Sequence, residues 1–394
     1  MKTKVLNFIF LISCFLFLAS GLIRATFFPK DVNNYENRYA VQFNPFSVKA
    51  FFDSSLQVDS SLQDNCEDTL ADQVLMSQTM KKEYNYLNSG FKLSILNPLL
   101  SADLNRYISF NSKLFFNGNI CFPVRTLEES RPYLDSKINN YNQYFASHPD
   151  TEFYIYYIEK DTDIDFETNE SMGISDYIFT HVNLPKNHMA TFEVNSFSDF
   201  QNYFYKTDHH WNYKGSYLAY QQVLSLLGCE ENPLIPKDTM TVSHSFAGSK
   251  VADMGGLYTE DFTAYQFEFP PMSVRLNGND QSVDYGAADA FFNGERTDAT
   301  YGNFYGGDDG EIVFDTHNTE KENILLIGES YDNAILKLVA SHYNRTYSVD
   351  LRYYEAYMGH AFHLEQYIKE NNISKVLLIG NVDYFEMQDF LLED

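Results

Sequence analysis

The chain has 394 residues, of which 44% are hydrophobic and 21% charged, a composition typical of a folded protein rather than a disordered one. Its 54 acidic residues outnumber its 28 basic ones, so the net charge is −26. This charge argues against nucleic acid as a partner and against docking on anionic lipid through basic patches. Aromatic residues make up 16% of the chain. We interpret them mainly as core packing, with a Tyr-rich sugar-binding surface as the alternative.

The N-terminal segment carries a targeting signal. Basic Lys2 and Lys4 precede a run of 19 uncharged residues, 5–23, which Arg24 ends. A helix of that length spans a bilayer, and the basic residues before it place the rest of the chain outside the cytoplasm. We expect residues 1–25 to be a signal anchor, with a cleaved signal peptide as the alternative. The protein is then extracytoplasmic, and either membrane-anchored or secreted.

Residues 26–110 are expected to form an N-terminal extension packed on the core. Its first part, residues 26–60, is interpreted as a stalk, and apolar residues at helical spacing predict a helix over 62–88. Further along, the spacing predicts a helix over 134–148 and a strand over 153–158. A helix followed by a strand is typical of α/β folds.

The acidic stretch 161–175 is predicted to be a solvated loop. Asp161, Asp163 and Asp165 alternate as in a calcium-binding loop. An EF-hand requires Gly at the sixth position and Glu at the twelfth, which here are Phe166 and Met172. The pattern therefore excludes an EF-hand.

The cysteines form neither a disulfide framework nor a zinc site. Cys14 lies inside the apolar run, and Cys66, Cys121 and Cys229 are widely spaced. One bridge among these three and free, partly buried thiols are both compatible with the sequence.

The C-terminal part has the most regular pattern. Buried strands are predicted over 324–328 and 375–380 and a further strand over 347–351, with helices over 331–343 and 362–370 between them. Right-handed crossovers make such strands parallel and adjacent, and functional residues gather at their carboxyl ends. Residues 230–320, which are rich in Gly, Asp, Asn and Tyr, are interpreted as an insertion of loops and short strands.

Ser330 follows the first of these strands, in the segment Gly328-Glu329-Ser330-Tyr331, and immediately precedes a predicted helix. A strand–turn–helix junction exposes a serine hydroxyl and directs the N–H groups of the helix start toward a developing oxyanion. Ser330 is therefore a candidate nucleophile. The alternative is that it only caps the helix.

A serine nucleophile requires a base, and Asp208-His209-His210-Trp211 supplies the candidate. In an extended segment Asp208 and His210 lie on the same side, so the carboxylate orients the imidazole, while His209 points the opposite way. Trp211, the single Trp, is interpreted as a packing anchor. The open alternatives are a metal site and histidines satisfied in the core.

Asp208-His209-His210-Trp211 resembles the signature of the DHHW family of exported bacterial proteins, which is similar to the alginate O-acetyltransferase group of the SGNH hydrolase-like superfamily. The resemblance extends to the N-terminal segment, to Glu36-Asn37-Arg38 and to Gly328-Glu329-Ser330-Tyr331. It also includes Asp350-Leu351-Arg352-Tyr353-Tyr354 and the strand over 376–381. It implies a three-layer SGNH hydrolase-like α/β domain over 111–394, with a mainly parallel central sheet and an insertion at about 230–320.

The resemblance implies a triad of Asp208, His210 and Ser330. In the family the serine block usually has Gly-Asp-Ser, whereas here Glu329 replaces the Asp, which puts activity in question. The side chain of Arg352 is a candidate to stabilise an oxyanion or bind an anionic sugar, with a structural ion pair as the alternative. Gly328, Asn381 and Tyr353 are further oxyanion or substrate candidates, and Trp211 and His209 are supporting residues.

Three functions are compatible with these residues. The first is an O-acetyltransferase or acetylesterase acting on a cell-surface polysaccharide, with no cofactor or metal. The resemblance implies that a membrane-bound O-acyltransferase supplies the acetyl group. The second is a catalytically inactive carbohydrate-binding or assembly protein of the cell envelope. The third is a metal-dependent phosphoesterase.

Overall fold

The structure is a computed structural model that describes residues 2–30, 32–33, 38–42, 61–74, 76–100, 104–110, 113–254, 258–281, 285–387 and 392. The chain divides into two compact units, residues 1–97 with 247–258 and residues 98–246 with 259–394. Much of the expected stalk, including residues 43–60, lies outside the described residues, as do Glu36 and Asn37.

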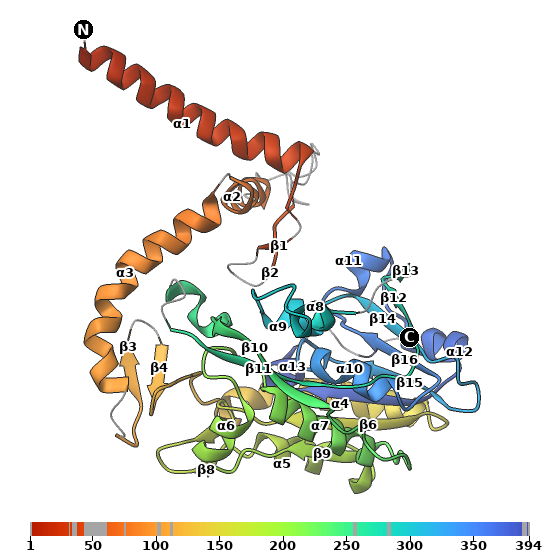
Figure 1. Cartoon of the computed structure of the whole chain (residues 1–394). Coiled ribbons are helices and arrows are strands. Elements are labelled where there is room, and N and C mark those ends of the chain that lie inside the picture. Colours follow the sequence, from red (N-terminus) through yellow and green to blue (C-terminus); the bar gives the residue numbers. More distant parts are fainter. Residues whose placement is uncertain are drawn as a thin grey trace. The chain divides into compact units, whose positions relative to one another are not determined.

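The first unit is mainly helical (Figure 1). Its elements are α1 (Lys2–Phe27), β1 (Val32–Asn33), β2 (Arg38–Tyr39), α2 (Ser61–Gln73), most of α3 (Ser77–Leu100) and a 3₁₀ turn (Ser249–Met254). Within α1, residues 5–27 are long and apolar enough to cross a membrane, which agrees with the expected N-terminal segment. The single helix expected over 62–88 is wrong, because the chain breaks between α2 and α3, where Met76 has a φ of +63°.

The central sheet of the second unit has eight strands in the order β13-β12-β14-β16-β15-β17-β6-β9 (Figure 1). Their bounds are β6 (Glu152–Ile158), β9 (Met189–Phe192), β12 (Ser273–Leu276), β13 (Asn279–Gln281), β14 (Glu311–Asp315), β15 (Asn323–Ile327), β16 (Arg345–Val349) and β17 (Ile373–Gly380). The five strands β16, β15, β17, β6 and β9 are parallel. The mainly parallel sheet and the adjacent, parallel C-terminal strands are thus confirmed.

Helices cover both faces of this sheet and complete three layers. Ile324 and Leu326 of β15 pack in one core with α7 (Tyr213–Leu226) and α10 (Asn333–Ala340). Leu325 and Ile327 pack in the other. The helices of this second core are α4 (Leu127–Ser147), α5 (Ile174–His181), α12 (Leu364–Asn371) and α13 (Val382–Glu386). Strands buried on both faces account for the continuous apolar runs in the sequence.

The remaining elements of this unit lie around the sheet and include the hairpin β10–β11, whose strands pair antiparallel. They are β3 (Ile108–Phe110), β4 (Lys113–Phe116), β5 (Asn119–Cys121), β7 (Ile164–Asp165), β8 (Glu170–Ser171), a 3₁₀ turn (Lys186–His188), α6 (Phe197–Tyr203), β10 (Asp238–Phe246), β11 (Glu260–Gln266), α8 (Ala288–Phe292), α9 (Tyr301–Tyr305) and α11 (Tyr354–Met358).

Residues 230–320 are not an insertion throughout. The strands β12, β13 and β14 come from this segment and extend the central sheet by antiparallel pairing, β14 against β16. The segment therefore contributes its own edge to the sheet. Short strands separated by Gly and Asn turns have no local feature that distinguishes a sheet extension from a separate hairpin.

The acidic stretch 161–175 is not a solvated loop. Asp161 and Asp163 are buried, and β7 pairs with β8 in a short hairpin. Asp163 accepts hydrogen bonds from the Tyr157 hydroxyl at 2.6 Å and from the Thr162 hydroxyl at 2.9 Å. These contacts explain how the carboxyl groups are accommodated in the interior.

No disulfide joins Cys121 and Cys229 in the part of the chain that the structure describes. The side chain of Cys66 lies outside the described residues.

Candidate active site

The candidate residues lie at the carboxyl end of the parallel strands. Ser330 follows β15, Asp350 follows β16, Asn381 follows β17 and Lys160 follows β6. Since these four strands are adjacent and parallel, their ends meet at one edge of the sheet.

Ser330 occupies a turn between β15 and α10 and does not cap the helix. The helix begins at Asn333, two residues later than predicted, and Asp332 is its N-cap residue. A Cβ atom on Gly328 would lie 2.5 Å from Asp332 Oδ2 and 2.8 Å from Ile379 Cγ2, so only glycine fits before the turn. The Gly328 N–H donates to the Val349 carbonyl at 3.2 Å, within the sheet.

The second candidate segment is a bent loop that leads into α7. The Asn212 side chain caps α7 by accepting from the N–H groups of Lys214 and Gly215. Before it, Phe204 and Trp211 form an isolated antiparallel bridge that closes the loop. The two ends of the loop that carries Asp208 and His210 are thus fixed by the bridge and by the helix cap.

Asp208, His210 and Ser330 form a continuous hydrogen-bonded chain. His210 Nδ1 lies 2.5 Å from Asp208 Oδ1, and its Nε2 lies 2.8 Å from Ser330 Oγ. The His210 backbone N–H also donates to Asp208 Oδ1, at 3.0 Å. Because an ionised carboxylate only accepts hydrogen bonds, Nδ1 carries the proton and Nε2 is left to accept from the serine hydroxyl.

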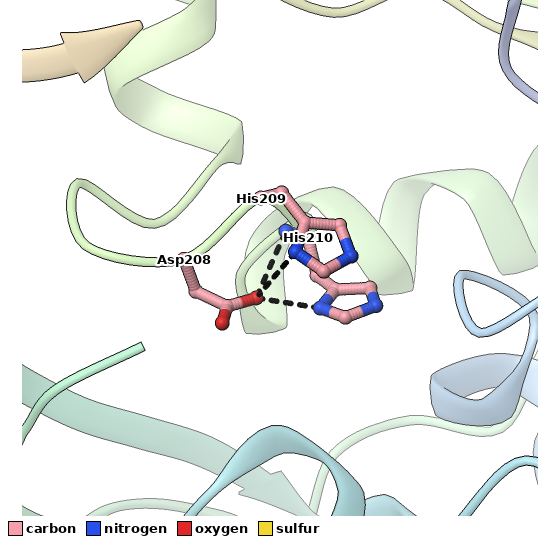
Figure 2. A group of neighbouring side chains, drawn as sticks. All are labelled: Asp208, His209 and His210. Carbon is pink, nitrogen blue, oxygen red and sulfur yellow. Dashed lines mark hydrogen bonds and ion pairs between the residues drawn. The ribbon is translucent and has the colours of Figure 1, made fainter. Parts of the chain in front are cut away.

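His209 does not point away from this chain, so the expectation for its side chain is wrong. Figure 2 shows its ring beside that of His210, with the centroids 3.8 Å apart. Its Nδ1 lies 3.9 Å from Asp208 Oδ1. The reason is that residues 206–210 form bends rather than a strand, so the alternation of an extended segment does not apply.

Aromatic rings surround the imidazole of His210. The Tyr301 ring stacks on it with a centroid distance of 3.7 Å and an angle of 2°. Trp211 is fully buried, and its Nε1 donates to the Tyr301 hydroxyl at 3.1 Å. The Tyr331 hydroxyl donates to the His209 carbonyl. Trp211 is therefore the packing anchor that the sequence predicts.

The hairpin β10–β11 holds the start of the loop. Glu260 of β11 accepts from the backbone N–H of Thr207 at 2.7 Å and from its hydroxyl at 2.8 Å. Burial raises the pKa of Glu260, and the hydrogen bonds from Thr207 offset only part of this rise. Neither Glu260 nor Tyr301 was a candidate from the sequence, since no local motif marks either residue.

Glu329, in the place where the family usually has Asp, is buried and bonded. Asn381 Nδ2 donates to its Oε1 at 2.7 Å, and Arg352 Nη1 lies 3.8 Å from its Oε2. Burial raises the pKa of Glu329, while the cations Arg352 and Lys160 act to lower it. The longer side chain therefore has specific partners in the segments that follow the two neighbouring strands, β16 and β17.

The guanidinium of Arg352 lies among carboxylates. It donates from Nη2 to Asp350 Oδ2 at 2.5 Å, and lies 3.4 Å from Asp308 Oδ2 in addition to its contact with Glu329. The ring of Tyr353 lies 5.2 Å below it. These contacts correspond to the structural ion pair considered from the sequence. Asn381 in turn directs its amide to Glu329, and its Oδ1 accepts from Asp383 N–H at the start of α13.

A groove opens beside His209, with about 1020 Å³ of empty space that is partly open to solvent. We call it the Phe122–Asp383 groove after two of its lining residues. The complete lining is Phe122, Pro123, Val124, Arg125, Glu129, Lys160, Thr162, His209 and Asp383.

Asp208, His209 and His210 also meet a geometric condition for metal binding. One ligand atom from each lies within 4.8 Å of the others. Imidazole nitrogens and a carboxylate oxygen suit several divalent transition metals. In the present arrangement, however, the same Asp208 oxygen and both His210 nitrogens are used in the hydrogen-bonded chain to Ser330.

The second unit has three layers around a mainly parallel sheet, and Asp208, His210 and Ser330 form a hydrogen-bonded chain at the carboxyl edge of that sheet. The sequence profile of the DHHW proteins matches residues 153–349, half of the chain. The chain belongs to the DHHW family.

Solved structures share this fold. Bacillus cereus PatB1 with a sulfonyl adduct has 19% identity and a TM-score of 0.53, covering 74% of this chain and 100% of that one. A DHHW family protein from Eubacterium siraeum DSM 15702 has 16% identity and a TM-score of 0.53, covering 73% and 98%. At these identities the similarity concerns the fold. None of the curated proteins matches the sequence.

Proposed function

We propose that this protein is a serine acyl-transfer enzyme, an O-acetyltransferase or acetylesterase that acts on an extracytoplasmic polysaccharide. The observation that carries the proposal is the chain from Asp208 Oδ1 through His210 to Ser330 Oγ, with contacts of 2.5 and 2.8 Å. This is the arrangement in which a histidine activates a serine hydroxyl. The polysaccharide and the membrane-bound acetyl donor rest on the family resemblance.

The chemistry proceeds in two half-reactions. Ser330 Oγ attacks the carbonyl carbon of an acetyl ester while its proton passes to His210 Nε2, and Asp208 stabilises the imidazolium. The ester bond to the donor breaks, the departing oxygen takes the proton from His210, and an acetyl-Ser330 ester remains. A sugar hydroxyl or water then attacks this ester, again losing its proton to His210, and free Ser330 is restored.

The test is hydrolysis of p-nitrophenyl acetate by the full chain in detergent. Ser330→Ala is expected to lower the rate by about 10⁴-fold or more, because the nucleophile is lost. Ser341→Ala is the control. Ser341 lies at the other end of α10, where its hydroxyl donates to the Lys337 carbonyl, and its loss should leave the rate unchanged. A Ser330→Ala protein with undiminished turnover would show that the triad is wrong.

A wild-type protein with no turnover is a separate outcome. Labelling with an aryl sulfonyl fluoride then distinguishes a triad that lacks its acyl substrate from an inert fold, because only an activated serine hydroxyl displaces fluoride. Peptide mass spectrometry is expected to find the sulfonyl group on Ser330. Wild-type protein without label and without turnover would favour the carbohydrate-binding alternative.

The metal-dependent phosphoesterase is the second candidate because Asp208, His209 and His210 are close enough to bind an ion together. It predicts that purified protein contains a divalent metal and hydrolyses a phosphodiester in proportion to the metal content. It also predicts that His209→Ala lowers the activity as much as His210→Ala does. The acyl-transfer proposal predicts that His210→Ala is far more damaging.

A further inference from the structure

The Phe122–Asp383 groove adjoins the proposed triad through His209. In the sheet order, β17 is next to β15 and β6 is next to β17. Ser330 follows β15, Asp383 lies just after β17, and Lys160 follows β6, so the groove covers the ends of the neighbouring strand β17 and of β6 beyond it. His209 lines the groove and also contacts the His210 ring, which joins the groove directly to the triad.

Asp383 is a carboxylate that is held in place yet accessible. Its side chain is 44% exposed, with Lys160 Nζ 2.9 Å from Oδ2 and Arg125 Nη2 3.5 Å from Oδ1. A carboxylate has about four acceptor positions, so two oxygens with one cation each can still accept from hydroxyl groups. A fixed acceptor costs little conformational entropy when a ligand binds.

Lys160 forms an ion pair with this carboxylate from the interior of the protein. Its side chain is only 3% exposed. Burial acts to lower its pKa, but the charges of Asp383, Asp161 and Glu329 raise the pKa above its ordinary value. The ammonium group therefore stays charged and remains the ion-pair partner of Asp383.

Phe122 adds an apolar surface to the groove. It is 38% exposed, and Lys160 Nζ lies 5.2 Å from the centroid of its ring. Its backbone N–H donates to Asp161 Oδ2 at 2.9 Å, which fixes the start of the groove wall. An exposed ring beside a fixed hydrogen-bond acceptor suits a ligand with an apolar face and a hydroxyl-bearing edge, as a pyranose ring has.

The charges of the groove favour an uncharged ligand. Both of its cations already have carboxylate partners, Lys160 with Asp383, and Arg125 with Asp383 and Glu386. An anionic sugar would have to displace one of these carboxylates, and it would also meet a chain of net charge −26. A neutral sugar needs only the acceptor positions that remain on Asp383.

We propose that the Phe122–Asp383 groove binds the acceptor saccharide as an uncharged pyranose chain, with one ring on Phe122 and its hydroxyls on Asp383. This inference rests on the proposed acyl-transfer function for the identity of the reaction, but the binding itself does not require turnover. It can therefore be tested in a protein that lacks the nucleophile.

The test measures binding to the full-chain Ser330→Ala protein in detergent. The probes are arrayed oligosaccharides of glucose, galactose, mannose and N-acetylglucosamine, together with glucuronate, galacturonate and mannuronate oligosaccharides of equal length. We expect at least one neutral oligosaccharide to bind. Adding Phe122→Ala should weaken this binding about tenfold or more, which corresponds to about 1.4 kcal/mol. Asp383→Asn should also weaken it, because the fixed carboxylate is lost.

The matched control is Tyr133→Ala in the same background, since Tyr133 is an exposed aromatic residue of α4 outside the groove. It should leave the affinity within twofold. Asp383→Asn removes the partner of a buried lysine and can unfold the protein, in which case Phe122→Ala decides. Binding of uronate oligosaccharides alone, no oligosaccharide binding, or binding unaffected by Phe122→Ala would each overturn the inference. A wild-type protein with neither ester hydrolysis nor sulfonyl labelling of Ser330 would instead refute the proposed chemistry and leave the binding result standing.

Discussion

His210 is enclosed by rings on both faces of its imidazole. Tyr301 stacks on one face at 3.7 Å and His209 lies against the ring at 3.8 Å. The electron-rich face of a tyrosine stabilises a cation above it. In the proposed reaction His210 becomes an imidazolium, so Tyr301 acts as a positioning residue that also favours this charge.

We therefore expect Tyr301→Leu to lower kcat/KM for the acetyl ester about fivefold, since a cation–π contact is worth about 1 kcal/mol. Tyr301→Phe keeps the ring but loses the hydroxyl that contacts Trp211 and Tyr331, and it should retain most of the activity. Rates are compared well below the Tm of each variant. Equal losses in the Leu and Phe variants would mean that the hydroxyl, rather than the ring, is what matters.

The departure at Glu329 has a local explanation. Its carboxylate is bonded to Asn381, which follows β17, and lies near Arg352, which follows β16. The resemblance to the family puts activity in question at this position. The contacts show how the longer side chain is accommodated without displacing Ser330 from His210.

At the scale of elements, α4 contains a buried cation that affects stability. Lys137 is 1% exposed; its Nζ donates to the Met387 carbonyl at 3.1 Å and lies 5.5 Å from the rings of Tyr141 and Tyr384. Burial lowers the pKa of Lys137 to about 7. Below this pH the folded state carries a poorly solvated charge.

Lys137→Met is accordingly expected to raise Tm, and to do so in a pH-dependent way. In the unfolded chain the lysine stays protonated up to about pH 10.4. Between pH 7 and that value the unfolded state binds the extra proton, so wild-type stability rises with pH. The increase in the free energy of unfolding caused by Lys137→Met should be largest at pH 7 and below, at most about 5 kcal/mol. It should become smaller toward pH 10. Thermal denaturation from pH 6 to 10 tests this; a gain independent of pH would contradict it.

At the scale of the whole molecule, the apolar N-terminal helix has two parts. Residues 5–17 are exposed, whereas Gly21 and Ala25 are buried. A Cβ atom on Gly21 would lie 2.6 Å from Val74 Cγ2, so α1 approaches α2 closely at this point. Removal of the helix by a signal peptidase would expose this surface of α2.

We therefore expect the segment to be retained as an anchor. The intact mass of protein extracted from membranes should include residues 1–25, and the protein should stay in the membrane pellet after alkaline carbonate washing. Gly21→Leu keeps the apolar length of the N-terminal segment, but the larger side chain prevents the close approach of α1 to α2. This variant therefore serves as the control for the contact between the two helices. A mature protein that begins after residue 19, found in the soluble fraction, would show that the segment is a cleaved signal.

The sequence by itself determined the features that depend on local periodicity and on short motifs. The apolar runs of β15 and β17 predicted buried parallel strands, because both faces of such strands are covered, and the aromatic run of β6 predicted a strand. The uncharged run near the N-terminus predicted the apolar helix. Asp208, His210 and Ser330 were selected by residue chemistry and family resemblance, and the structure brings them within hydrogen-bonding distance.

Only the tertiary structure decided the contacts between distant segments. Tyr301 lies 91 residues beyond His210 in the chain, yet it stacks on its ring; Asp161 and Asp163 are buried by neighbours that no local pattern reveals. The direction of the His209 side chain depended on whether residues 206–210 bend. Whether residues 230–320 form an insertion or part of the central sheet depended on the strands with which β12 and β14 pair. Strand pairing and burial are set by packing across the whole chain, and a local window of sequence contains no information about a partner that lies outside it.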